Sequence, residues 1–317
     1  MAAAVTAAAI GAAPPYSPPF GTWTRLNDTR PILAPDGSGF EGRGVFNPAV
    51  VRDGHRFVML YRAQDARGVS TIGFATSQDG IGFVRDPKPA LTPDAPYEQG
   101  GGVEDPRLVK IQNRWYLTYT AYDGKNAQLA LAVSSDLRTW VRHGVIMPAN
   151  RGRWNIHWTK SGAILDTRVA GRYWMYYMAD AAGGSDQTGI AWSTDMTTWT
   201  EALDGPVLPR RPGRFDARVV EPGPPPILTD DGILLIYNGA DDQLAYRTGW
   251  ALFDKKDPTK LIARSDSPVF EPQAAWERQG QVPNVVFVEG LVRMGSRWLF
   301  YYGGADTVVG VAEARSR

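Results

Sequence analysis

Short runs of apolar and aromatic residues recur along the chain, and each ends in a tyrosine that is followed by small residues and an aspartate. The first run ends at Tyr61, and similar runs end at Tyr119, Tyr177, Tyr237 and Tyr302. The intervals between these tyrosines are 58, 58, 60 and 65 residues. Runs of this length and composition behind turn residues predict β-strands. The pattern therefore predicts five copies of a unit of about 60 residues.

A second apolar strand follows in most units and ends in a Ser-x-Asp turn with an aromatic residue beyond it. An aspartate in such a turn can accept hydrogen bonds from backbone N–H groups, and the aromatic ring can pack back on the strands. We expect these turns to be structural. The three aspartates are Asp79, Asp136 and Asp195.

Five units of three or four strands each predict an all-β fold, a five-bladed β-propeller formed by residues 20–317 as a single domain. A two-sheet sandwich is the alternative, but it does not predict a fivefold repeat. Residues 1–19 are rich in alanine and proline. They are interpreted as a disordered leader or the remnant of a secretory signal, and the lack of a charged n-region favours the leader. The compartment stays open between the cytoplasm and the periplasm of a bacterium.

Composition excludes several classes of function. The chain has 317 residues, no cysteine, and 34 lysines and arginines against 33 aspartates and glutamates. It can form no disulfide or thiolate site, and it lacks the net positive charge typical of nucleic-acid binders. No apolar run is long enough to span a membrane. The three histidines show no zinc-binding spacing, so we expect neither a metal nor another cofactor.

Polar residues that occur in only one unit are the candidates for chemistry, because structural repeats do not explain them. Residues 100–107 read Gly-Gly-Gly-Val-Glu-Asp-Pro-Arg. Strand alternation places Asp105 and Arg107 on one face and Glu104 on the other. The alternative is a purely structural Asp–Arg pair at a blade edge. Because the blades of a propeller converge on one axis, such residues from different blades can meet in one funnel.

Four further candidates lie at the starts of other predicted strands. Asn47 precedes a proline, and Glu221 precedes the rigid tract Pro-Gly-Pro-Pro-Pro. His157 and Lys160 lie before a strand of small residues. Each has a plainer interpretation: a turn residue for Asn47, a turn or packing residue for His157, and solvated surface charges for Lys160 and Glu221.

Two carboxyl groups on different blades, together with many aromatic residues, indicate a carbohydrate-cleaving site. Asp105 and Glu221 are the expected pair. A separation of about 6.5–9.5 Å between them would indicate inversion, and one near 5 Å retention. Arg107 beside Asp105 would lower the pKa of that carboxyl, which opposes direct general-acid catalysis unless burial or a proton relay compensates.

Taken together, these segments resemble glycoside hydrolase family 130. The resemblance runs from about residue 40 to 312 and is carried by residues 46–50 (Phe-Asn-Pro-Ala-Val), 102–107 (Gly-Val-Glu-Asp-Pro-Arg), 118–122 (Thr-Tyr-Thr-Ala-Tyr), 160–164 (Lys-Ser-Gly-Ala-Ile), 223–227 (Gly-Pro-Pro-Pro-Ile) and 235–239 (Leu-Ile-Tyr-Asn-Gly). It implies a five-bladed propeller that acts on β-mannosides with inversion, by phosphorolysis or hydrolysis. It also implies that Asp105 is the general acid, with a proton route through a sugar hydroxyl.

Differences from the family's phosphorylases favour hydrolysis. Where those enzymes carry an Arg-Asn pair, a histidine, and a glycine before Gly-Pro-Pro-Pro, this chain has Asp123-Gly124, Asn238 and Glu221-Pro222. An acidic Asp123 would repel phosphate, and Glu221 could deprotonate water instead. Arg62, Arg142 and Lys160 remain candidate anion ligands, which keeps phosphorolysis open.

The sequence thus predicts an inverting, exo-acting β-mannosidase, with β-1,2-linked manno-oligosaccharides as expected substrates. The alternatives are a mannosyl phosphorylase that forms mannose 1-phosphate, a non-catalytic glycan-binding propeller, and a furanosidase. Asp105 is expected to supply the proton and Glu221 to activate water. The expected substrate-binding residues are Asn47, Arg62, Asp65, Glu104, Arg107, Tyr122, His157, Lys160, Asn238 and Asp306. No nucleic-acid or membrane partner is expected, and the oligomeric state is not predicted.

Overall fold

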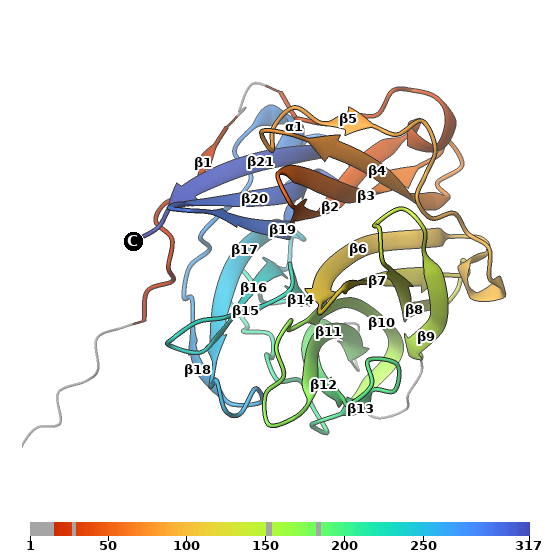
Figure 1. Cartoon of the computed structure of the whole chain (residues 1–317). Helices are drawn as coiled ribbons and strands as arrows, with labels where there is room; N and C mark the ends of the chain where they lie inside the picture. The colour runs from red at the N-terminus through yellow and green to blue at the C-terminus, as the bar shows by residue number, and fades with distance from the viewer. Residues whose placement is uncertain (1–15, 27–29, 150–153, 182–184) are drawn as a thin grey trace, which may run out of the picture.

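The computed structural model describes residues 16–26, 30–149, 154–181 and 185–317, and it is built almost entirely of β-strands. Helix is limited, within these ranges, to η1 (Gly39–Glu41), η2 (Pro96–Glu98) and α1 (Ala275–Arg278). The prediction of an all-β fold is confirmed. The strands form three hydrogen-bonded sheets of four, nine and eight strands. In each of the two larger sheets one parallel pairing, Ser70 with Gly102 or Asp186 with Val219, joins two antiparallel groups. Five antiparallel groups therefore follow one another along the chain and lie around a common centre (Figure 1).

Each group begins with the strand nearest the centre and continues outward by antiparallel neighbours. The first group is β2 (Gly44–Asp53), β3 (Arg56–Gln64), β4 (Ser70–Ser77) and β5 (Val84–Arg85). The second is β6 (Gly102–Ile111), β7 (Arg114–Tyr122), β8 (Ala127–Ser134) and β9 (Val141–Met147). The third is β10 (Asn155–Ile164), β11 (Tyr173–Ala181), β12 (Ser185–Ser193) and β13 (Thr200–Glu201).

The last two groups differ slightly in their strand content. The fourth is β14 (Val219–Pro222), β15 (Ile227–Leu228), β16 (Ile233–Ala240), β17 (Tyr246–Phe253) and β18 (Leu261–Arg264). The fifth is β19 (Val286–Met294), β20 (Arg297–Gly304) and β21 (Val308–Arg315), and β1 (Thr24–Arg25) from the other end of the chain pairs with β21. The N-terminal strand therefore completes the C-terminal group.

The repeated tyrosines are the most regular feature of the core. All five are fully buried on the second long strand of their groups. Each lies opposite a residue with little or no side chain on the next strand: Tyr61 opposite Gly73, Tyr119 opposite Ala130, Tyr177 opposite Gly189, Tyr237 opposite Gly249 and Tyr302 opposite Gly310. A Cβ atom at Gly73 would lie 2.3 Å from the Tyr61 ring. The small residue therefore makes the room that the ring fills.

Each tyrosine hydroxyl also donates a hydrogen bond to a carboxylate, which satisfies a polar group that burial would otherwise leave unpaired. The acceptors are Glu41 for Tyr61, Glu98 for Tyr119, Glu201 for Tyr177, Asp216 for Tyr237 and Glu277 for Tyr302. The sequence repeat is thus a repeated structural unit. The predicted turns are structural as well: Asp79 accepts from the backbone of Ile81 and Gly82, each at 2.8 Å, and Asp136 and Asp195 do the same in their turns.

The first strands of the groups carry irregularities that position the site. The register shifts at Asn47 in β2, at Asp105 in β6 and at Ser161 in β10, and these residues have φ angles of 49°, 50° and 58°. A bulge of this kind bends a strand and re-aims a side chain. Contacts link β19 to β2, β2 to β6, β6 to β10 and β10 to β14. The bulged residues therefore gather where these strands meet.

The beginning of the described chain is held against the fold. The Tyr16 ring lies 5.1 Å from that of Trp250, and the backbone N–H of Arg317 donates to the Pro19 carbonyl at 3.1 Å. The predicted leader falls mainly on residues 1–15, which lie outside the described residues. Among the described residues, no helix has the length and apolar character needed to cross a membrane.

Candidate active site

Asp105 lies at the centre of a polar cluster that it forms with Asn47, Arg62 and Glu104. Its carboxylate accepts a hydrogen bond from the Asn47 side-chain amide at 2.8 Å, and Arg62 NH1 lies 3.3 Å from the same oxygen. Arg62 NH2 also contacts Glu104 at 2.5 Å, while Ser70 donates to Glu104 at 3.1 Å. These residues come from the first two groups, so the structure joins four predicted site residues in one network.

The pKa values of two neighbouring carboxyls in this network, Asp105 and Glu104, are shifted in opposite directions. Burial alone would raise the pKa of Asp105, but Arg62, the hydrogen bond from Asn47 and the charges of Lys160 and Arg107 lower it. Burial raises the pKa of Glu104, and the charge of Arg62 only partly offsets this. Neighbouring carboxyls whose pKa values differ in this way are typical of acid–base sites.

The sequence left open a direct pair between Arg107 and the Asp105 carboxylate. In the structure Arg107 binds the Asp105 backbone carbonyl instead. Its side chain is only 1% exposed, and its guanidinium donates to the backbone carbonyls of Asp105, Pro222 and Gly223 at 3.1, 2.7 and 2.8 Å. Arg107 therefore ties β6 to the end of β14. It affects Asp105 through its charge and through the backbone.

Glu221 lies near the end of β14, a strand that contacts β10. It is buried, and its Oε1 accepts a hydrogen bond from the hydroxyl of Ser161, the bulged residue of β10. Burial raises the pKa of Glu221, the charges of Lys160 and Arg107 oppose the shift, and the negative charge of Asp105 adds to it. Glu221 and Asp105 thus share one electrostatic environment, and neither points into bulk solvent.

Lys160 is a half-buried cation among these carboxyls. Burial disfavours its charged form, but Glu221, Asp186, Asp105 and Glu104 together raise its pKa. Its ammonium group lies 5.1 Å from the centre of the Trp158 ring. It forms no hydrogen bond or ion pair with the residues that the structure describes. The charge is therefore available to a ligand.

Asp306 adds another carboxyl from the loop between β20 and β21. Its backbone has a φ angle of 49°, and its carbonyl accepts from the Gln281 side chain at 2.6 Å. Burial raises the pKa of its carboxyl to about 7, the charge of Arg62 opposes the shift, and Asp105 and Glu221 contribute to it. Asp306 therefore changes charge near neutral pH within reach of the cluster.

The structure gives four other predicted residues local roles. Asp65 accepts from the backbone of Arg67 and Val69 within its own turn. The Tyr122 hydroxyl donates to the carbonyl of Gly124 at 3.1 Å. Asn238 bridges β16 and β19 by a pair of hydrogen bonds with the backbone of Val288. Arg142, a candidate anion ligand, pairs instead with the structural Glu98 at 3.0 Å.

His157 lies on β10 beside the cluster. Its side chain is 55% exposed, and its Nδ1 contacts the buried carboxyl of Asp180. Further along β10, Trp158 and Lys160 both lie near Asp186: its Oδ1 accepts from Trp158 Nε1 at 3.1 Å, and burial raises its pKa while the charge of Lys160 opposes the shift. His157 is thus held on the rim by a buried partner rather than packed as a core residue.

Three polar residues that the sequence did not single out belong to this region. Glu289 on β19 is buried and lies 3.2 Å from Arg107. Asp186 neighbours Lys160, and burial raises its pKa. Burial also raises the pKa of Tyr246, to which the charges of Glu221, Asp186 and Asp306 contribute. Glu289 could have been found from the sequence, because it is the one charged residue in the apolar run of residues 286–292.

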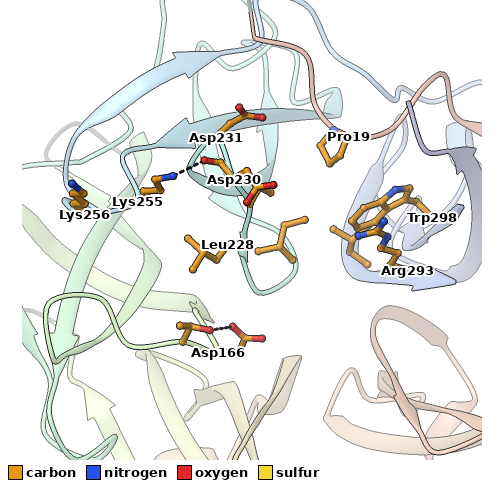
Figure 2. Close-up of a pocket in the computed structure, with 13 residues that line it drawn as sticks. Pro19, Asp166, Leu228, Asp230, Asp231, Lys255, Lys256, Arg293 and Trp298 are labelled. Atoms are coloured by element: carbon orange, nitrogen blue, oxygen red, sulfur yellow. Dashed lines mark hydrogen bonds between the residues drawn. The ribbon is translucent and has the colours of Figure 1, made fainter. Parts of the chain in front are cut away.

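Other cavities lie away from the cluster. One of about 1060 Å³ is lined by residues of β15 and β19 and of the β15–β16 and β17–β18 loops, including Asp230 and Lys255, with Arg293 beside Trp298 (Figure 2). None of the predicted site residues lines it. No group of three or more His, Asp or Glu in the described ranges could hold a metal ion. The polar cluster around Asp105 is therefore the candidate active site.

Comparisons with known proteins agree with the resemblance. A family model for Glyco_hydro_130, described as beta-1,4-mannooligosaccharide phosphorylase, matches residues 28–317. Two relatives from Thermoanaerobacter sp. (strain X514), a 1,2-beta-oligomannan phosphorylase and a beta-1,2-mannobiose phosphorylase, are each 36% identical over 91% of this chain and 95% and 96% of their own.

A solved structure with a TM-score of 0.85 covers 96% of this chain and 98% of its own at 32% identity. It is described as "The GH130 family of mannoside phosphorylases contains glycoside hydrolases that target beta-1,2 mannosidic linkages in Candida mannan".

These relatives correct the expectation of a hydrolase, since those at 36% identity are phosphorylases. Asp123, which was expected to repel phosphate, accepts from the backbone of Lys125 and Asn126 in a turn of its own.

Proposed function

Because the chain belongs to glycoside hydrolase family 130, we propose that it is a phosphorylase of β-mannosides. It would cleave β-1,2-linked manno-oligosaccharides with inorganic phosphate and release mannose 1-phosphate. The names of the two Thermoanaerobacter relatives support the linkage and the reaction. In this reaction a phosphate oxygen forms a bond to the anomeric carbon and gives up its proton. The glycosidic bond breaks, and the leaving oxygen takes up a proton.

Asp105 is proposed to supply the proton to the leaving oxygen, directly or through a hydroxyl of the sugar. Its low pKa makes direct transfer unfavourable, because little of the carboxyl is protonated near neutral pH. In a route through a substrate hydroxyl the protons balance as follows: the hydroxyl gives its proton to the leaving oxygen and takes one from Asp105, and the proton that the phosphate gives up returns Asp105 to its starting state. Asn47, Arg62, Glu104 and Asp306 are proposed to bind the other hydroxyls of the sugar.

The observation that carries the proposal is the unpaired ammonium of Lys160. A lysine that has no ion pair among the described residues, yet keeps a raised pKa, can hold a phosphate oxygen as a point charge. Glu221 contributes most among the carboxyls to the raised pKa of Lys160, and Asp105 contributes as well, so the three groups share one electrostatic environment.

We also propose that the five antiparallel groups are the blades of a closed five-bladed propeller, and that residues 20–317 form one catalytic domain. The five tyrosine–carboxylate pairs support equivalent blades. The pairing of β1 with β21 supports closure, since it joins the two ends of the chain in one blade.

The proposed function is tested by incubating the protein with β-1,2-mannobiose, with and without inorganic phosphate, and identifying the products. Phosphorolysis predicts mannose 1-phosphate and one equivalent of mannose, formed only when phosphate is present. Mannose alone, released at the same rate in both incubations, would refute the proposal. Binding of mannobiose in a calorimeter without any product would indicate a glycan-binding protein instead.

A further inference from the structure

Arg107 connects the two strands that carry the proposed catalytic carboxyls. Its guanidinium donates to the Asp105 carbonyl on β6 and to the carbonyls of Pro222 and Gly223, next to Glu221 at the end of β14. Asp105 has a φ angle of 50°, a strained conformation for an L-residue that persists only where its surroundings enforce it. The hydrogen bond from Arg107 is part of that enforcement.

Glu289 is the carboxyl that faces Arg107 from a third strand, β19. Its side chain is fully buried, and its Oε1 lies 3.2 Å from Arg107 NH2. Neither carboxyl oxygen has a hydrogen-bond partner among the described residues. A buried carboxyl with so little compensation is costly for the fold. Stability therefore does not explain its presence in the apolar stretch of residues 286–292.

A cavity of about 320 Å³ lies next to Glu289, beyond the polar cluster. The later parts of β2, β6 and β19 form its walls, with Val50, Leu108 and Leu291 among the lining residues, and Arg52 and Lys110 also contribute. A cavity of this volume is large enough for several waters or a small organic anion. The cavity thus adjoins the position of Glu289, and removal of the buried side chain would open onto it.

We propose that Glu289 is a positioning residue for the reaction at Asp105. Its carboxyl holds the Arg107 guanidinium in the orientation that fixes the backbone next to both catalytic carboxyls. The inference rests on the proposed function, because it concerns the same site and the same bond cleavage. A displacement of about 1 Å in a catalytic group can cost about 100-fold in rate. Loss of Glu289 is therefore expected to act on kcat more than on substrate binding.

The test compares Glu289→Gln and Glu289→Ala with the wild type, using β-1,2-mannobiose with and without phosphate and measuring both mannose 1-phosphate and free mannose. Glu289→Gln keeps an acceptor for Arg107, so its kcat should stay within about threefold of wild type. Glu289→Ala should lose about tenfold or more in kcat while KM for mannobiose changes less than about twofold. Sodium formate, which fits the adjoining cavity, should restore much of the lost kcat.

Glu98 provides matched controls, because it is equally buried but binds Tyr119 and Arg142 away from the cluster. Glu98→Gln should change thermal stability without a split between kcat and KM, and formate should not raise the kcat of Glu98→Ala. The inference is overturned if Glu289→Ala keeps wild-type kcat, if it changes KM alone, or if formate has no effect on it. If Glu289→Ala does not fold, a kcat for Glu289→Gln more than tenfold below wild type overturns it. If the wild type releases only mannose, the proposed function fails, yet the same kcat comparison still tests Glu289.

Discussion

The side-chain amide of Asn47 donates a hydrogen bond to the carboxylate of Asp105 at 2.8 Å, although the two residues lie 58 positions apart in the chain. Both residues occupy strand bulges, with φ angles of 49° and 50°. The first strands of two successive groups thus carry bulges at two residues that contact each other. The contact joins two residues that we propose for the active site, and it can be tested by mutation.

Asn47→Ala should shift the pH dependence of catalysis. The hydrogen bond from Asn47 stabilises the ionised form of Asp105 and so lowers its pKa. Without it the pKa rises, the carboxyl stays protonated to higher pH, and the alkaline limb of kcat/KM moves to higher pH. The pH profile of the variant should be compared with that of Asn113→Ala, which changes an exposed turn. An unshifted alkaline limb would contradict the assignment of Asp105 as the acid.

Asp105→Asn should abolish turnover, by about 1000-fold or more, because it removes the only proton that we assign to the leaving group. The fold should remain, since an asparagine keeps the shape of the side chain. Thermal unfolding followed by circular dichroism checks the fold, and product release checks the activity. A folded variant with more than about a tenth of wild-type kcat would exclude Asp105 as the source of the proton.

Lys160→Gln should weaken phosphate binding specifically. Removing one charge that contacts a phosphate oxygen should raise KM for phosphate about tenfold or more. Lys110→Gln is a matched control, because Lys110 lies 4.8 Å from the Trp115 ring, much as Lys160 lies 5.1 Å from Trp158, but it is exposed and outside the cluster. Equal KM values for phosphate in the two variants would remove Lys160 from the phosphate site.

The affinity for phosphate should fall as the pH rises through neutrality. Asp306, with a pKa of about 7, is mostly neutral at pH 6 and mostly ionised at pH 8, where its charge repels the anion. KM for phosphate should therefore rise between these pH values. Phosphate itself titrates in this range, so Asp306→Asn serves as the control, and its KM should vary less. Parallel curves for the two proteins would show that Asp306 does not act on phosphate.

The tyrosine repeat gives a prediction about stability. Gly73→Ala would place a Cβ atom 2.3 Å from the buried Tyr61 ring, so the free energy of unfolding should fall by about 1–3 kcal/mol. Ala130→Gly, at the equivalent position opposite Tyr119, should cost only about 0.5–1 kcal/mol. Urea denaturation measures both. A Gly73→Ala protein as stable as wild type would mean that the ring has room to move.

The sequence predicted the all-β fold correctly because the signals for its strands and turns are local and repeated. A tyrosine at the end of an aromatic run and a Ser-x-Asp turn each report on their own neighbourhood, and five copies reinforce the inference. Asp105, Asn47 and Lys160 were also visible, because they interrupt the repeat. Their meeting follows from the bulged first strands.

Pairing between distant strands could not be read from local patterns. Asn238 looked like a ligand because it replaces a family residue, but its amide bonds to β19, which lies 50 residues further on. Glu289 looked like an isolated charge in a strand until its contact with Arg107 became visible. The raised pKa of Glu221 could not be predicted from the sequence, because its main cause is burial in the folded protein.

The central claim is that phosphate, rather than water, attacks the anomeric carbon. It is tested most directly by ³¹P NMR of the protein with β-1,2-mannobiose and an excess of inorganic phosphate. We predict that a mannose 1-phosphate signal grows as mannobiose is consumed, one equivalent for each bond cleaved. Consumption of mannobiose with no change in the phosphate signal would contradict the claim.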